Sequence, residues 1–391
     1  MNRFLISICS RYVQVVITMF AVVCSASAAQ SGNAFNPSIS LILNGTYGAF
    51  SKDPSVYGIS GFPLGEESEP GVEGFSLGET ELSISANIDP NWYGAFTLAM
   101  PGDGSPGVEN AYIQSTSIGD GLTLRGGRFF SGIGYLNERH AHTWDFIDTA
   151  LPYRALLGTQ YGDDGIQIRW LAPTDLFVEA GAEWMRGDSF PAGGGANSGR
   201  GTWSGFIHLG GDVGSSHSWR AGLSYLSAKA INRESGATDF FTGTSKILIA
   251  DLVWKWAPNG NTYRRNFKFQ AEYLQSSNKG DFTPGGASAT PYSATSSGWY
   301  AQGVYQFMPR WRVAIRHDQL KTDDPGVVFN NTTLDKQGHN PKRDSVMIDH
   351  NFSEFSRVRL QYNRDQSQPK VDNQWFLQYT MSLGAHGAHL F

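Results

Sequence analysis

The conformation of the chain is most clearly indicated by one stretch, Phe267-Lys268-Phe269-Gln270-Ala271-Glu272-Tyr273. Its apolar and polar residues alternate with a period of two. Successive side chains of a β-strand point to opposite faces, so this segment has one apolar and one polar face. In a membrane barrel the apolar face contacts lipid and the polar face lines an aqueous interior. The stretch therefore predicts a membrane-spanning strand.

Similar alternation recurs along most of the chain. It predicts an all-β fold, a transmembrane antiparallel β-barrel of about sixteen strands. The predicted strands lie at residues 38–50, 75–89, 91–101, 108–117, 121–131, 164–172, 175–187, 201–212, 216–228, 245–258, 264–277, 296–308, 310–321, 343–353, 355–365 and 373–391.

The connections between these strands alternate in length. Short turns such as Asp89-Pro90-Asn91 and Pro258-Asn259-Gly260 are separated by longer polar segments that are rich in glycine. The long segments are residues 51–73, 132–163, 188–200, 229–244, 278–295 and 322–342. Outer-membrane barrels combine short periplasmic turns with long extracellular loops, whereas a soluble β-sandwich has no reason to alternate in this way.

Composition excludes helical spanning of a membrane. The mean hydropathy is −0.30 and hydrophobic residues make up 40% of the chain. After the first thirty residues, no stretch is long and apolar enough for a transmembrane helix. An acidic exported chain is also a poor partner for nucleic acid.

The N-terminal residues resemble a secretory signal peptide. Arg3 and Arg11 precede a short apolar run, and Ala26-Ser27-Ala28 follows it as a cleavage site. The run is too short for a transmembrane anchor. We expect residues 1–28 to be a signal for Sec export and residues 29–391 to form a single barrel domain. Cleavage would remove two arginines and no acid, so the net charge would change from −5 to −7. It would also remove both cysteines.

Aromatic residues support the same orientation. Five tryptophans lie beside short turns, where they predict a periplasmic girdle: Trp92, Trp170, Trp219, Trp256 and Trp311. The chain ends in Phe391. Outer-membrane barrels commonly end in an aromatic residue that the assembly machinery recognises, so this machinery is an expected partner.

Several motifs resemble those of a known family, the porins of the phosphate-selective type. The similarity is closest to a subgroup labelled zinc-regulated TonB-dependent outer-membrane receptors. The motifs are residues 61–65, 75–79, 135–146 and 381–389. The resemblance implies a homotrimer in contact with outer-membrane lipid and lipopolysaccharide.

Size argues against the receptor part of that label. A TonB-dependent receptor has a plug and a 22-stranded barrel, which need more residues than the 391 of this chain. We therefore expect a pore of porin size that passes small hydrophilic solutes. A phosphate-selective pore resembles a ladder of basic residues, and this acidic chain departs from that pattern.

Charged residues of both signs occupy the predicted polar faces. The acidic wall candidates are Glu79, Glu81, Glu179, Glu183, Asp251, Glu272 and Asp318. The basic wall candidates are Arg169, Arg220, Lys255, Lys268, Arg312, Arg316, Arg357 and Arg359. The basic residues concentrate in the later strands, which indicates either a transverse field across the pore or simple solvation of the lumen.

The segment 132–163 is the candidate pore-constricting loop. It is the longest connection, and its aromatic residues would be out of place on a free extracellular loop. Pro152 suits the start of a short helix. The residues expected at the constriction are Glu138, Arg139, His140, Asp145, Asp148 and Arg154.

The same loop offers an alternative, a metal site. His140 and His142, with Glu138 or Asp145, are suitable zinc ligands, but a His-x-His pair is common by chance. His386 and His389 in the tail have a simpler interpretation as residues of the periplasmic rim.

Three classes of function remain open. The leading one is a porin for passive diffusion. The second is a substrate-specific or metal-related uptake channel, which the family label associates with zinc limitation. The third is a barrel enzyme or an adhesin. No catalytic residue is predicted, because no nucleophile elbow, phosphate-binding loop or zinc-protease helix is present in the sequence. No cofactor is predicted.

Overall fold

The computed structural model describes residues 37–65, 68–100, 106–194, 199–236, 238–285 and 287–384. The predicted signal peptide, His386, His389 and Phe391 lie outside these ranges. The strands are β1 (Ser38–Phe50), β2 (Gly74–Leu77), β3 (Thr80–Asp89), β4 (Trp92–Met100), β5 (Gly107–Ser115), β6 (Leu122–Phe130), β7 (Gly162–Leu171), β8 (Phe177–Met185), β9 (Thr202–Val213), β10 (His217–Glu234), β11 (Phe240–Trp256), β12 (Asn266–Thr283), β13 (Thr290–Met308), β14 (Trp311–Thr322), β15 (Lys342–Ser353), β16 (Ser356–Gln366) and β17 (Asp372–Gly384). The helical elements are α2 (Leu151–Leu157) and the 3₁₀ turns η1 (Pro54–Val56), η2 (Ala141–Thr143), η3 (Pro258–Gly260) and η4 (Val327–Phe329).

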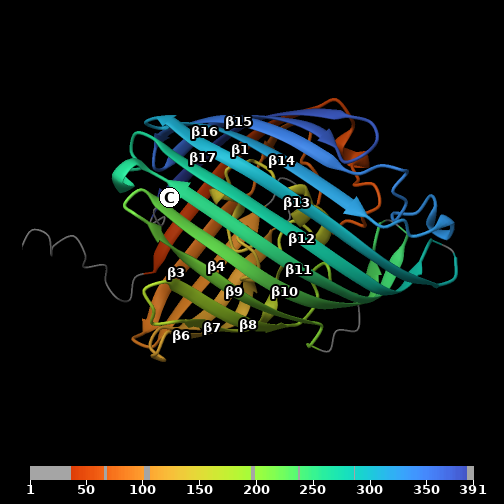
Figure 1. Ribbon diagram of the computed structural model, residues 1–391, viewed down its shortest axis with the longest axis horizontal. Helices are drawn as coiled ribbons and strands as arrows, with labels where there is room; N and C mark the ends of the chain where they lie inside the picture. The colour runs from red at the N-terminus through yellow and green to blue at the C-terminus, as the bar shows by residue number, and fades with distance from the viewer. Residues whose placement is uncertain are drawn as a thin grey trace, which may run out of the picture.

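The strands close into one antiparallel barrel (Figure 1). β2 and β3 both pair with β1 and are separated only by residues 78–79, so together they act as one strand. The barrel therefore has sixteen strands, and the predicted fold class is confirmed. β1 and β17 close the sheet, with register from Ser40 opposite Gly384 to Phe50 opposite Gln374.

The apolar side chains of the alternating strands point to the outer surface of the barrel. Aromatic residues border this surface toward the short turns, where Trp92, Trp170 and Trp311 are 38%, 42% and 37% exposed. A second row of exposed aromatic residues, not predicted from the sequence, includes Trp184, Trp203 and Trp299. Two bands of amphipathic rings are what a barrel needs at the two membrane interfaces. Among the residues that the structure describes, no helix is long and apolar enough to cross a membrane.

Four strands, β10 to β13, are longer than the rest. They have 17 to 19 residues, whereas β3 to β8 have 9 or 10. About ten residues suffice for a tilted strand to span the membrane. The extra residues form a wall, and the ends of these long strands extend to the right in Figure 1.

This wall corrects two predicted loops. Residues 229–244 and 278–295 are mostly strand, because β10 runs to Glu234 and β13 begins at Thr290. Outside the membrane the outer face of the wall is polar, so its sequence resembles a loop. Its inner face packs on inward-folded loops through a cluster of apolar residues: Ala230, Phe241, Phe282, Tyr292, Ala294, Phe329 and Leu334.

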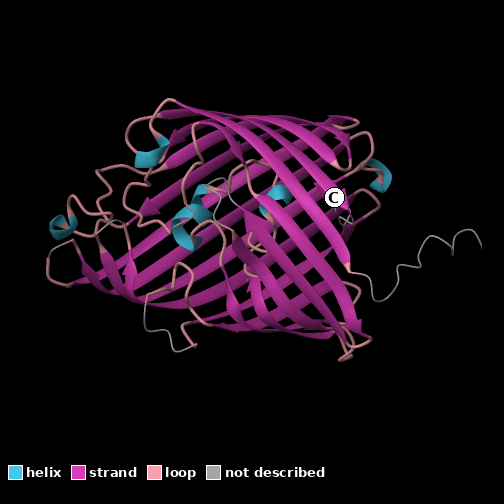
Figure 2. Ribbon diagram, turned by 180° about the vertical axis from the view of Figure 1, so that it is seen from behind, coloured by secondary structure: helices cyan, strands magenta, loops and turns pink. Residues whose placement is uncertain are grey.

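The barrel interior contains its own hydrophobic core. Apolar residues of β10, β11, β12 and β14 point inward, where a water-filled pore would need polar ones. They are Leu226, Ile247, Ile249, Leu274 and Leu320, all fully buried. Helix α2 and the long loops cover them, and Figure 2 shows these segments inside the ring of strands.

Candidate functional site

The connection between β6 and β7 folds into the barrel. We call residues 131–161 the inner loop; they correspond to the predicted segment 132–163. Asn137 closes the neck of this loop, because its amide donates to the carbonyl oxygens of Ser131 and Tyr161, each at 2.8 Å. Its Oδ1 accepts from the Tyr161 N–H at 2.8 Å. The two ends of the loop are thereby held together at the wall.

Glu272 on β12 holds the first turn of the inner loop. Its carboxylate accepts hydrogen bonds from the backbone N–H groups of Tyr135 and Leu136, each at 3.0 Å. The hydroxyl groups of Tyr153 and Tyr300 donate to the same carboxylate at 2.7 and 2.5 Å. Glu272 is only 2% exposed, so these four donors replace water around a buried acid.

Helix α2 forms the apolar anchor of the inner loop. Pro152 lies in its first turn, as predicted, and Gly158 ends it in the left-handed region with φ of 63°. All seven residues of α2 are buried, and they pack against β12, β13 and β14. Ile59 and Phe62 of the connection 51–73 belong to the same core.

Ion pairs anchor the part of the inner loop that lies between the Glu272 contact and helix α2. Asp148 accepts 2.7 Å hydrogen bonds from Arg316 and Arg343, and Asp318 bridges the same two arginines. Burial alone would raise the pKa of Asp148, but the guanidinium groups of Arg343 and Arg316 outweigh it and hold the pKa well below its usual range. The carboxylate is therefore charged inside the barrel.

Neighbouring residues repeat this pattern. Asp145 pairs with Lys268 and with Arg312, the latter at 3.2 Å. Arg357 and Arg359 donate to the carbonyl oxygens of His142 and Trp144 at 3.0 and 2.9 Å. Five basic candidates of the later strands thus contact the inner loop and hold it against the wall: Lys268, Arg312, Arg316, Arg357 and Arg359.

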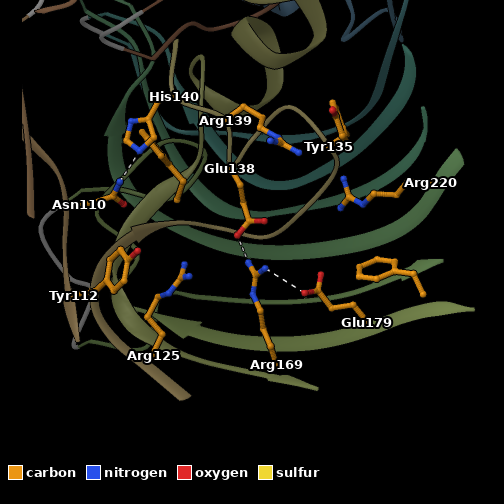
Figure 3. A pocket seen from close by; sticks show the side chains of 12 residues that line it. Asn110, Tyr112, Arg125, Tyr135, Glu138, Arg139, His140, Arg169, Glu179 and Arg220 are labelled. Carbon is orange, nitrogen blue, oxygen red and sulfur yellow. Dashed lines mark hydrogen bonds and ion pairs between the residues drawn. The ribbon is translucent and has the colours of Figure 1, made fainter. Parts of the chain in front are cut away.

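A hollow of about 460 Å³ remains beside the inner loop. Its wall residues come mostly from the ends of strands near the short turns, and Figure 3 shows their side chains converging on it. It is lined by Asn110, Tyr112, Arg125, Phe130, Tyr135, Glu138, Arg139, His140, Arg169, Phe177, Glu179 and Arg220. Four arginines against two glutamates give this lining a formal charge of +2, His140 aside.

The arginines of the hollow are held in place by rings and acids. Arg125 lies 4.4 Å from the centroid of Tyr112, and Arg139 and Arg220 lie over Tyr135 at 4.9 and 5.2 Å. Arg169 forms ion pairs with Glu138 and, at 3.5 Å, with Glu179. Such fixed guanidinium groups can bind anions without a large loss of conformational entropy.

A histidine–carboxylate cluster lies at the edge of the hollow. His140 Nδ1 is 2.9 Å from Glu109 Oε2 and 3.2 Å from Glu81 Oε2, and His142 Nδ1 is 2.6 Å from Glu81 Oε1. Burial alone would lower the pKa of His140, but hydrogen bonds to Glu109 and Glu81 outweigh it and raise the pKa to about 10.

The structure divides the predicted constriction residues into two groups. Glu138, Arg139 and His140 line the hollow. The side chains of Asp145, Asp148 and Arg154 are buried, each about 5% exposed, in ion pairs against the wall. The second group therefore positions the loop rather than facing open space.

The wall candidates divide in a similar way. Arg169, Glu179 and Arg220 line the hollow, and Glu79 and Glu81 lie at the histidine cluster. Glu183 is covered by the loop, because Ser131 and Gly132 donate hydrogen bonds to it. Six further candidates contact the loop: Lys268, Glu272, Arg312, Arg316, Arg357 and Arg359. Asp251 is 5% exposed, and Lys255 is half-buried.

Sequence reasoning missed several residues of the hollow and cluster. Arg125 and Tyr112 lie on the polar faces of β6 and β5, so the alternation could have found them. Glu109 could not have been found, because strict alternation places it on the outer face. A bulge in β5, where Thr97 opposes Asn110 and Leu98 opposes Val108, turns Glu109 inward.

Comparisons with solved structures agree with this architecture. A loop L8 deletion mutant of OmpT, an outer membrane protein of Vibrio cholerae, has a TM-score of 0.55 and 11% identity, and the match covers 89% of this chain and 99% of that one. The channel DcaP of Acinetobacter baumannii has a TM-score of 0.54 and 11% identity, with 89% and 97% covered. OmpF of Salmonella typhi gives 0.53 and 13%, with 90% and 99% covered. These similarities show the fold: a sixteen-stranded barrel of the porin type.

One sequence relative defines the family. A protein of Aquifex aeolicus, described as an uncharacterized protein, is 31% identical over 394 residues, which cover 92% of this chain and 81% of the relative. The chain belongs to the same family as this Aquifex protein. No family model matches the chain.

Proposed function

We propose that the protein is a channel of the Gram-negative outer membrane for passive diffusion of small hydrophilic solutes, with a preference for anions. The observation that carries the proposal is the hollow inside a closed barrel, whose lining has four arginines and two glutamates. Fixed positive charge in a confined space raises the local concentration of anions. A solved structure with a TM-score of 0.50 and 11% sequence identity to this chain is described as an anion-selective porin from Comamonas acidovorans, and this similarity concerns the fold alone.

The inner loop would set the width of the channel. Its apolar anchor and its ion pairs fix it on one side of the barrel, and Glu138, Arg139 and His140 reach the hollow from it. Because those anchors are buried, the loop behaves as part of the wall and not as a mobile lid. The proposal therefore assigns selectivity to a rigid constriction.

Bilayer recordings test this function. The purified full chain, refolded in detergent and added to planar bilayers, should give discrete ohmic conductance steps. In a KCl gradient the reversal potential should show preference for chloride over potassium. Chains that are folded, as judged by heat-dependent gel migration, but give no conductance would contradict the channel and favour an enzyme or an adhesin.

Assembly as a homotrimer is part of the proposal. One solved neighbour, OmpT of Vibrio cholerae, is described as a trimer form. Light scattering of the detergent-solubilised protein should give the mass of three chains. A monomeric mass in every detergent tried would refute the trimer while leaving the channel intact.

A second candidate is a metal-related uptake channel, which the subgroup resemblance implies. The observation that favours it is the cluster of Glu81, Glu109 and His140. Conductance that saturates or is blocked at low Zn²⁺ concentration, but not at equal Mg²⁺ concentration, would support this candidate over general diffusion.

A further inference from the structure

We propose that Glu81, Glu109, His140 and His142 form a binding site for a divalent transition-metal ion at the junction of the inner loop and the barrel wall. Glu81 lies on β3 and Glu109 on β5, whereas both histidines come from the inner loop. The inference does not require channel activity, since it concerns the binding of an ion to this cluster.

The geometry of the donor atoms is close to that of a metal site. Glu81, Glu109 and His140 each offer one ligand atom, a carboxylate oxygen or a ring nitrogen, and these three atoms lie within 4.8 Å of one another. His140 Nδ1 lies 2.9 and 3.2 Å from oxygens of Glu109 and Glu81. Ligands bound tetrahedrally to zinc at roughly 2.0–2.2 Å are separated from each other by about 3.3–3.6 Å. Small shifts of the side chains would therefore admit an ion.

A third carboxyl group supplies an independent indication. Glu79 lies next to Glu81 and Glu109, and its Oε1 is enclosed with no hydrogen-bond partner among the described residues. A buried acceptor without a partner costs free energy, and it does so all the more beside two other carboxylates. A cation at the cluster would compensate this charge.

The backbone is irregular at both strands that supply the acids. The bulge in β5 turns Glu109 to the same side as Asn110, whose amide lies 2.9 Å from His140 Nε2. The break between β2 and β3 at residues 78–79 contains Glu79 and lies just before Glu81. Bulges interrupt sheet hydrogen bonds and often re-aim side chains at functional sites. Asn110 then orients the His140 ring from the second coordination sphere.

The ligand types select the class of ion. Two imidazoles with carboxylates suit Zn²⁺, Co²⁺ and similar first-row ions, whereas Mg²⁺ and Ca²⁺ prefer oxygen ligands alone. The ion has a route to the site, because His140 also lines the hollow. Its side chain is 24% exposed, and that of Glu81 is 1% exposed. Binding would tie the inner loop to β3 and β5.

Cobalt absorption and zinc calorimetry test the site on the full refolded chain. We expect one Co²⁺ per chain with a visible d–d spectrum, displaced by Zn²⁺ and unaffected by excess Mg²⁺. Glu81→Gln and His140→Ala should each weaken binding by more than about a hundredfold, and Asn110→Ala by about tenfold to a hundredfold. Gel migration of heated and unheated samples verifies that each variant is folded.

His317→Ala is the matched control. His317 also pairs with a carboxylate, because its Nδ1 lies 2.7 Å from Asp344 Oδ1, but this pair is exposed on the barrel surface. Since His317 is not part of the proposed cluster, its loss should leave metal binding unchanged. Equal binding by wild type and Glu81→Gln, or no saturable binding by folded wild type, would overturn the site and identify the cluster as an ion-pair network. Neither result would alter conductance without metal, so failure here is distinguishable from failure of the channel.

Discussion

Arg343 donates a 2.7 Å hydrogen bond to Asp148, although 195 residues separate them in the chain. The side chain of Arg343 is fully buried and that of Asp148 is 5% exposed. The bond joins β15 to the inner loop, and Arg316 and Asp318 complete the network. Charges that are shielded from water interact strongly but tolerate the loss of a partner poorly. The position of the inner loop therefore depends on a few buried pairs.

Replacing Asp148 should loosen the inner loop. Asp148→Asn leaves Arg316 and Arg343 with one fewer anion in a buried site, and removal of one partner from such a pair costs about 3–5 kcal/mol. We expect noisier single-channel currents and new protease cleavage within the loop. Asp164→Asn is the control, since Asp164 pairs with Arg128 at a site where both side chains are 40–44% exposed. A change there should cost at most about 1 kcal/mol; equal effects of the two variants would contradict the anchoring role.

Acid should release the loop only at very low pH. The folded pKa of Asp148 is lowered, so its contribution to docking is present above the ordinary carboxyl pKa and is lost as the pH falls through the lowered value. Burial alone would raise the pKa of Asp145, but the charges of Lys268 and Arg312 outweigh it and hold the pKa below its usual range. We expect the conductance to stay steady from neutral pH down through the usual carboxyl range. A transition at the ordinary carboxyl pKa would show that these acids are not paired.

Gly134 should not tolerate a side chain. Its φ is +66°, and a Cβ there would lie 2.5 Å from the Tyr153 hydroxyl and 2.6 Å from Glu272 Oε2. Gly134→Ala therefore combines backbone strain with a clash at the Glu272 anchor, which we expect to cost about 1–3 kcal/mol in loop docking. Gly107→Ala is the control, because its Cβ would meet nothing within 4 Å. Amide hydrogen exchange of residues 135–137 measures both; unchanged protection in Gly134→Ala would refute the anchor.

Neutralising two arginines of the hollow should abolish its anion preference. Arg125 and Arg220 line the hollow, and their replacement by Gln takes the formal charge of its lining from +2 to 0. Arg125 donates to the Gln114 side chain and Arg220 to the Gly134 carbonyl oxygen, so the replacements break neither of the ion pairs that Arg169 forms with Glu138 and Glu179. The reversal potential should move toward that of a nonselective pore. Arg364→Gln on the exposed face of β16 should have no effect, and an equal shift there would place selectivity elsewhere.

The barrel could be predicted because its strands obey a local rule. Side-chain alternation in segments such as 267–273 depends only on neighbours in the chain, and the structure confirms the strands it predicts. The rule failed where the surroundings change. Ile247 and Ile249 face the core made by the loop, so both faces of β11 are apolar there. The outer wall of β10 to β13 stands in water, so its pattern no longer resembles a membrane strand.

The site was only partly predictable, because its contacts are distant in sequence. The inner loop was recognised from its length and aromatic content, and His140 and His142 from their spacing. Their partners were expected within the same loop, at Glu138 or Asp145. The structure instead brings Glu81 and Glu109 to them from the wall. No local pattern encodes a contact that depends on barrel closure and on a bulge.

The anchors of the inner loop also bear on the order of assembly. The loop occupies residues 131–161, but its partners Lys268, Arg312 and Arg359 lie far along the sequence, on β12, β14 and β16. While only the first half of the sheet is formed, Asp145 and Asp148 have no basic wall to meet. The passage can take its final shape only when the last strands are in place. A sheet that lacks β12 and β14 therefore lacks the two cations that hold Asp145 against the wall.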